Sequence, residues 1–103
     1  MTITTGLDIP THKLAEVCRR YQISQMSLLG SAARGELGPE SDVDVLVEFE
    51  PNAVWGLDYF GLEQELAQLL GRRVDLATKK WLKPAVRERI LRDARVIWSK
   101  RRK

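Results

Sequence analysis

Three aspartates and a Gly-Ser turn are the residues of this sequence whose types and spacing are suited to chemistry. Gly30 and Ser31 are followed, after ten residues, by Asp42 and Asp44, and Asp75 lies further along the chain. A strand that ends in Gly-Ser and leads into a helical turn presents free backbone N–H groups, which suit a phosphate. Carboxylate oxygens are hard ligands that Mg²⁺ takes together with phosphate oxygens. The combination therefore indicates a site for a phosphorylated ligand and a metal ion.

Each part of this site has a plain structural alternative. Ser31 is also a suitable N-cap, although Arg34, three residues on, does not complete a capping box. Asp42 and Asp44 would point to the same side of a strand, about 7 Å apart, where an isolated pair most often faces water. Asp75 changes the balance, because burying an unpaired charge in an apolar strand is unfavourable. One intervening helix allows the two strands to lie side by side, and three carboxylates there suit two metal ions about 4 Å apart.

The elements that would position these residues follow from the apolar periodicity. It predicts helices over about 11–22, 58–70 and 82–97 and a short helical turn over 31–34. Strands are predicted over 26–29, 42–49 and 74–77. The expected apolar face of the last helix comprises Leu82, Val86, Ile90, Ala94 and Ile97. The order αβαβαβα predicts an α/β (α+β) fold with helices packed on a small three-stranded mixed sheet.

Composition and charge restrict the class of protein. The 103 residues are expected to form one cytoplasmic domain over 1–103, because the sequence shows no signal peptide and no apolar run long enough to cross a bilayer. Cys18 is the only cysteine, which excludes an internal disulfide, and we expect it in the core. Residues 1–51 carry 4 Lys/Arg against 8 Asp/Glu, whereas residues 52–103 carry 13 against 6. The basic half suits phosphates or an acidic partner, or is a solvated helix face followed by a tail.

Two segments resemble a known family signature. The sequences GSAARGE (30–36) and SDVDVLV (41–47) are similar to the motif of the polymerase-β-like nucleotidyltransferase superfamily. More narrowly, the chain resembles the minimal nucleotidyltransferases, which are antitoxins encoded beside HEPN-domain toxins. The similarity continues through GRRVDL (71–76) and the basic segment 82–91, and it covers nearly the whole chain after Ile23. It implies the nucleotidyltransferase fold.

The resemblance also implies roles for individual residues and a reaction. The catalytic carboxylates, which would also hold Mg²⁺ as two ions, are Asp42, Asp44 and Asp75. The nucleotide-binding residues would be Gly30, Ser31 and Arg34. The implied reaction transfers AMP from ATP to a tyrosine hydroxyl of the cognate HEPN-domain RNase toxin and silences it. Neither a membrane nor a specific nucleic acid is expected as a partner.

Two other interpretations remain open from the sequence. One is a binding module that neutralises its partner by contact alone, through the basic helix and the tryptophans near it. Arg and Trp are frequent in interface hot spots, although we expect both Trp81 and Trp98 in the core. The other is a nucleotidyltransferase for a small molecule or an RNA end, but related enzymes of that kind usually need an extra domain to hold the acceptor.

Overall fold

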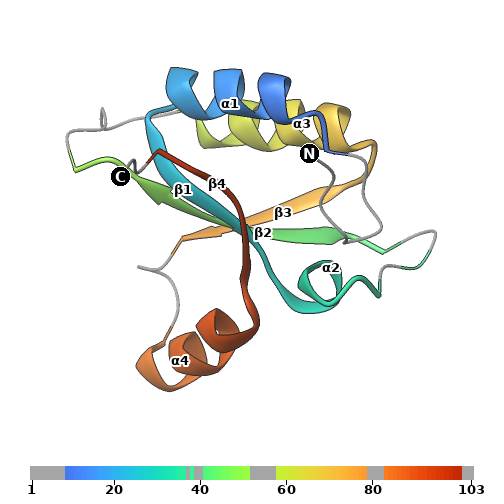
Figure 1. Ribbon diagram of the computed structural model, residues 1–103, viewed down its shortest axis with the longest axis vertical. Coiled ribbons are helices and arrows are strands. Elements are labelled where there is room, and N and C mark those ends of the chain that lie inside the picture. The colour runs from blue at the N-terminus through green and yellow to red at the C-terminus, as the bar shows by residue number, and fades with distance from the viewer. Residues whose placement is uncertain (1–8, 37, 39–40, 52–57, 79–82, 101–103) are drawn as a thin grey trace.

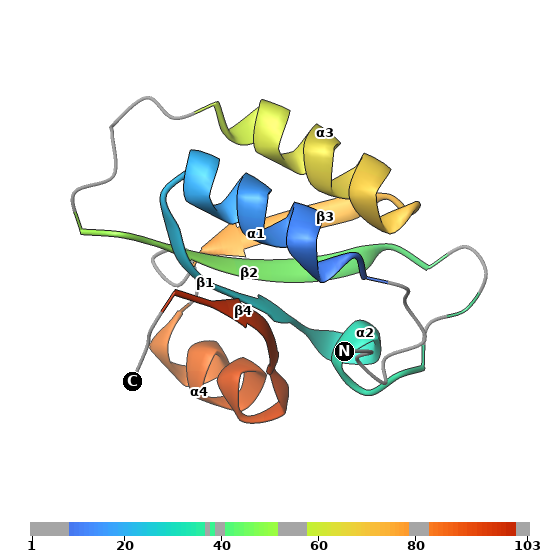
Figure 2. The same cartoon turned by 45° about the horizontal axis from the view of Figure 1, so that its top comes forward.

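The fold is a mixed sheet with two long helices on one face. The computed structural model describes residues 9–36, 38, 41–51, 58–78 and 83–100. In chain order its elements are α1 (Thr11–Arg20), β1 (Ile23–Leu28), α2 (Gly30–Ala33), β2 (Val43–Phe49), α3 (Tyr59–Leu70), β3 (Val74–Thr78), α4 (Pro84–Asp93) and β4 (Arg95–Ser99). The strand order is β3-β2-β1-β4, in which β2 and β3 are parallel and the other pairs antiparallel. Figures 1 and 2 show α1 and α3 over one face of this sheet and α4 on the other side.

The fourth strand corrects the sequence prediction of three strands. Residues 95–99 form β4 along β1, where the periodicity predicted the end of a helix over 82–97. The helix α4 instead ends at Asp93, and Ala94 has an extended backbone. The run RVIWS is short and rich in β-branched and aromatic residues, so its local pattern fits either state. These residues form a strand because they pair with β1, whose free edge offers unpaired N–H and C=O groups.

The predicted apolar face of the last helix does not form as expected. Val86 is 45% exposed, and none of the α4 residues is buried. Ile97 is buried, but from β4 rather than from the helix. Trp98 is half-buried and packs against the core, whereas Leu82 and Trp81 lie outside the described residues. In the part of the chain that the structure describes, no helix is long and apolar enough to cross a bilayer.

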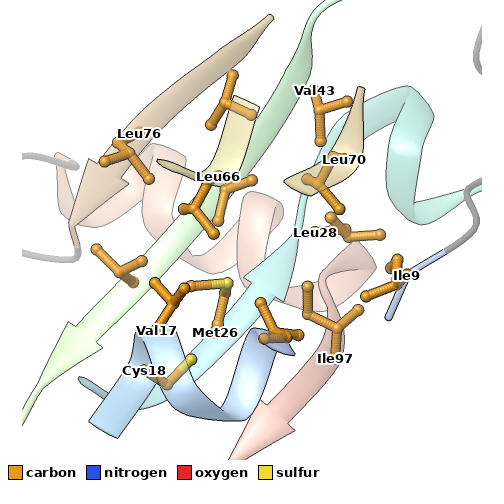
Figure 3. Close-up of a cluster of buried hydrophobic side chains, with 14 of the residues drawn as sticks. Ile9, Val17, Cys18, Met26, Leu28, Val43, Leu66, Leu70, Leu76 and Ile97 are labelled. Carbon is orange, nitrogen blue, oxygen red and sulfur yellow. The ribbon is translucent and has the colours of Figure 1, made fainter. Parts of the chain in front are cut away.

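The core lies between the sheet and the pair α1 and α3. The helices contribute the stripes that the sequence predicted, namely Leu14, Val17 and Cys18 from α1 and Leu62, Leu66 and Leu70 from α3. The strands contribute one face of the sheet, including Met26, Leu28, Val43, Leu76 and Ile97 (Figure 3). Successive strand residues point to opposite faces. The residues that alternate with this core therefore face away from α1 and α3.

Burial is expected to protect Cys18 from thiol reagents. Its side chain is 0% exposed, and burial raises the pKa of the thiol to about 12. Because only the thiolate is nucleophilic, we expect the native protein to resist alkylation by iodoacetamide at pH 8 and the urea-unfolded chain to react as a free thiol. Intact mass measures the labelling, and rapid labelling of the native protein would contradict the buried position.

The same burial predicts a pH dependence of stability. The free energy of unfolding should fall as the pH rises above 9.0, where only the unfolded chain loses the Cys18 thiol proton.

Candidate active site

The parallel strands β2 and β3 bring two of the predicted carboxylates together. Asp44 lies directly opposite Asp75 in the register of the two strands. Val43 and Val45 on either side of Asp44 are buried, as are both neighbours of Asp75. Both aspartates are exposed and alternate with these buried residues, so they lie on the face of the sheet opposite to α1 and α3. Asp42 is exposed as well and lies one residue before β2 begins.

Asp44 is repelled by the other two predicted carboxylates. The pKa of Asp44 is raised, first by partial burial and then by the negative charges of Asp75 and Asp42. Among the described residues, Arg73 forms an ion pair with Asp42, its Nε lying 3.8 Å from Asp42 Oδ1. Its side chain is 84% exposed, and exposed pairs of this kind contribute only about 0–1 kcal/mol. The site therefore keeps an excess of negative charge that a cation would relieve.

The carboxylate oxygens of this site suit a hard divalent cation that completes its coordination shell with water and phosphate oxygens. Among the described residues, no three His, Cys, Asp or Glu side chains converge closely enough to hold a metal ion by themselves. Mg²⁺ typically takes one or two carboxylates and completes its shell with water and phosphate oxygens. Asp44 and Asp75 in register, with Asp42 close enough to shift the pKa of Asp44, fit such a partial site. The residues thus fit Mg²⁺ bound together with a nucleotide.

The predicted phosphate turn adjoins this carboxylate pair. Gly30, the first residue of α2, has a φ of 55°, and a Cβ built there would lie 3.6 Å from Asp44 Oδ2. The Leu29 N–H donates to the Asp44 carbonyl at 2.9 Å, which ties the end of β1 to β2. Leu29, not Ser31, occupies the N-cap of α2, so the alternative interpretation of Ser31 as an N-cap is wrong. The Gly-Ser turn and Asp44 therefore lie side by side.

Arg34 is engaged with another residue. Its Nε donates to Glu36 Oε1 at 2.9 Å, and both side chains are largely exposed. The structure thus places Arg34 beside the turn but directs it to Glu36, and its contact with a nucleotide stays a prediction. No role was predicted from the sequence for Arg72, which donates to the Gly38 carbonyl, or for Arg73, which pairs with Asp42. Their position in the sequence, directly before the strand that carries Asp75, is the feature that could have indicated a role for these two arginines.

Replacing Gly30 by Ala is expected to weaken both folding and nucleotide binding. A left-handed backbone costs a non-glycine residue about 1–2 kcal/mol, and the new methyl group would lie 3.6 Å from Asp44 Oδ2, between the turn and the carboxylate. Urea denaturation and calorimetric binding of Mg²⁺-ATP check the two effects. Gly71→Ala is the matched control, because Gly71 has a φ of +70° and nothing within 4 Å of a Cβ. Equal loss of nucleotide affinity in both variants would contradict a specific role of Gly30.

A mixed sheet with two helices on one face and in-register aspartates beside a Gly-Ser turn on the other defines the nucleotidyltransferase class of enzyme. The comparison with known families agrees, because the nucleotidyltransferase domain family matches residues 12–97. This chain belongs to that family, and it is a nucleotidyltransferase. The fold prediction is thereby confirmed, with four strands in place of three.

Individual relatives and solved structures indicate which kind of nucleotidyltransferase this chain resembles. The chain is 39% identical over 87 residues to the protein adenylyltransferase MntA of Thermococcus cleftensis, and the match covers 82% of this chain and 84% of the relative. A solved structure described as a minimal nucleotidyltransferase has a TM-score of 0.69 at 38% identity, covering 82% of this chain and 85% of that one. A toxin–antitoxin crystal structure with AMP-PNP has a TM-score of 0.70 at 20% identity, covering 90% and 76%. The last likeness concerns the fold alone.

Proposed function

We propose that this chain, as a single cytoplasmic domain over residues 1–103, is an antitoxin that adenylylates its cognate HEPN-domain toxin. In this reaction AMP passes from ATP to a tyrosine hydroxyl of the toxin in the presence of Mg²⁺. The observation that carries the proposal is the in-register pair Asp44 and Asp75 beside the turn at Gly30. The name of the Thermococcus relative, protein adenylyltransferase, supports a protein as the acceptor.

The solved relatives support the same partner class. One is a tri-AMPylated Shewanella oneidensis HEPN toxin in complex with its MNT antitoxin, with a TM-score of 0.60 at 18% identity, covering 87% of this chain and 70% of that one. Another was crystallised with AMP-PNP, an ATP analogue. In those complexes an antitoxin of this fold is accompanied by a toxin or a nucleotide. We extend both ligands to this chain as part of the proposal.

In the proposed mechanism each residue of the site has a separate task. Asp42 and Asp44 would hold Mg²⁺ together with the triphosphate, and the backbone N–H groups at Gly30 and Ser31 would donate to phosphate oxygens. When bound, the metal supplies charge neutralisation at the triphosphate and favours loss of the proton from the attacking hydroxyl. Asp75 orients the tyrosine hydroxyl and accepts its proton. A bond forms between the tyrosine oxygen and the α-phosphorus, the bond from that phosphorus to the bridging oxygen breaks, and pyrophosphate leaves.

The second candidate function is neutralisation of the toxin by contact alone, and the exposed surface of α4 favours it. None of the α4 residues is buried, Val86 is 45% exposed, and Val96 on the following strand is 50% exposed. Arg89 and Arg92 are exposed on the same helix. Exposed arginines with apolar residues nearby suit a protein interface. This surface is compatible with catalysis too, since an acceptor protein must dock before it reacts.

Intact-mass analysis tests the proposal. The purified protein is incubated with ATP, Mg²⁺ and the HEPN-domain protein encoded beside it, and an identical sample contains EDTA. We expect the partner to gain one or more AMP groups only with Mg²⁺, to lose RNase activity and to carry the AMP on tyrosine in peptide spectra. Association of the two proteins without any gain of mass would overturn adenylylation and favour contact alone. Transfer of AMP to added RNA or to a small molecule in place of the protein would overturn the proposed acceptor.

A further inference from the structure

An arginine from the turn between α3 and β3 holds the segment that carries Asp42. Arg72 Nη1 donates to the carbonyl oxygen of Gly38 at 2.6 Å and to that of Ser41 at 3.2 Å. The Ser41 carbonyl belongs to the peptide bond that joins Ser41 to Asp42. The Arg72 side chain is half-buried, and its two acceptors lie 34 and 31 residues away in the sequence. The guanidinium therefore acts on the backbone that leads directly into Asp42.

The two acceptors of Arg72, Gly38 and Ser41, are the end residues of a turn and are joined by two hydrogen bonds. The Gly38 N–H donates to Ser41 Oγ at 2.9 Å, and the Ser41 N–H donates to the Gly38 carbonyl at 3.3 Å. Immediately after the turn, the Val43 N–H donates to the Arg73 carbonyl at 2.9 Å, where β2 and β3 begin to pair. Asp42 thus lies between two fixed points. Before it, Arg72 holds the carbonyls of the turn, and after it, the first residue of β2 is bonded to the Arg73 carbonyl.

The end of α3 directs Arg72 towards this turn. Gly71 has a left-handed backbone with φ 70° and ψ 24°, and both its N–H and that of Arg72 donate to the Ala67 carbonyl. This left-handed glycine ends the helix, and the chain turns into β3, where Asp75 is the third residue after Arg72. One short segment is consequently linked to Asp42 through a side chain and to Asp75 through the backbone.

We propose that Arg72 is a positioning residue that sets the place of Asp42 relative to Asp75 and thereby the affinity of the site for a divalent cation. The inference rests on the proposed metal site. Without the guanidinium, the Gly38 and Ser41 carbonyls lose a shared charged donor, and Ser41 gains conformational freedom directly before Asp42. Loss of a residue that holds a metal ligand typically lowers metal affinity about 10–100-fold. Lysine keeps the charge but lacks the planar fork, so it should replace Arg72 only in part.

The variants Arg72→Ala and Arg72→Lys test this role, with Arg20→Ala as the matched control. Arg20 also makes two side-chain bonds, to both Glu65 oxygens at 2.7 Å, but it links α1 to α3. Mn²⁺ in the presence of AMP-PNP is the probe, because the site is proposed to bind the metal together with a nucleotide, and electron paramagnetic resonance distinguishes the protein-bound ion from the free and the nucleotide-bound ion. We expect Arg72→Ala to bind Mn²⁺ at least about tenfold more weakly, Arg72→Lys to lie between, and Arg20→Ala to match the wild type. Hydrogen exchange of the Val43 amide should accelerate in Arg72→Ala alone.

The outcomes separate this inference from the proposed function. If the wild type binds no Mn²⁺, the metal site itself is wrong and the inference falls with it. If the wild type binds Mn²⁺ and both Arg72 variants bind equally well, only the role of Arg72 is overturned. A positioning role also predicts that Arg72→Ala needs more Mg²⁺ for half-maximal AMP transfer yet regains its rate at high Mg²⁺. A rate that stays low at every Mg²⁺ concentration, with an unchanged half-maximal Mg²⁺ concentration, would contradict it.

Discussion

Replacing Asp44 by Asn is expected to lower the rate of AMP transfer by about a thousandfold or more. Asn removes one negative charge at the point where Asp44 lies opposite Asp75, and with it a carboxylate of the proposed metal site. A bound metal contributes several kcal/mol of charge stabilisation in the transition state, and about 4 kcal/mol corresponds to a thousandfold change in rate. The rate of AMP incorporation into the partner protein, followed by intact mass, is the measurement.

The control is a carboxylate on a different element. Glu16→Gln changes an exposed acid of α1, on the face of the sheet opposite to Asp44, and should leave the rate at the wild-type level. Partner binding should survive in Asp44→Asn, because Asn occupies the same volume on an exposed position. A variant that still transferred AMP at a tenth of the wild-type rate would contradict the assignment of Asp44 to the metal site.

The same substitution is expected to stabilise the metal-free protein. Partial burial and the charges of Asp75 and Asp42 raise the pKa of Asp44 above its ordinary value of 3.8. The folded chain therefore holds this proton more tightly than the unfolded chain, and the free energy of unfolding declines as the pH rises from 3.8 through the folded pKa. At neutral pH the charged carboxylate is unfavourable, so Asp44→Asn should raise Tm in EDTA, and the difference should shrink in acid.

Leu66→Ala should lower the stability of the protein more than any substitution in the site. Leu66 is 0% exposed and lies in the middle of the buried stripe of α3, against the sheet (Figure 3). Truncating a fully buried leucine costs about 2–5 kcal/mol, through lost burial and the cavity that remains. Domains of this size have a total stability of only about 5–15 kcal/mol. We therefore expect a large fall in the urea midpoint, and partial unfolding at 37 °C.

A neighbouring position on the same helix provides the comparison for Leu66. Gln68 is exposed on α3, so Gln68→Ala keeps helix propensity and should change the free energy of unfolding by less than about 0.5 kcal/mol. Both variants are measured by urea denaturation at equal protein concentration. If Leu66→Ala lost less than about 1 kcal/mol, the packing of α3 on the sheet would have to differ from that described.

Elements with a strong local pattern could be predicted from the sequence. The buried stripe of α3 repeats every four residues from Leu62, and Gly71 takes the left-handed backbone expected of a helix end. The alternation around Asp44 in β2 likewise identified which residues face the core. The prediction failed at residues 94–97, because the five residues of the run 95–99 are of mixed character and fit a helix or a strand. There the residues form a strand because they pair with the free edge of β1, and the local sequence pattern contains no information about that edge.

The residue types available for chemistry, and the side of their own strands on which they lie, follow from the sequence alone. Alternation of side chains is a local property, so it already separates Asp44 and Asp75 from the apolar residues beside them. The folded structure was needed to show that β2 and β3 pair in parallel with Asp44 opposite Asp75, and that Arg72 reaches the turn before Asp42. Register and long-range hydrogen bonds depend on how distant segments pack together, and the spacing of residues within one segment does not encode that packing.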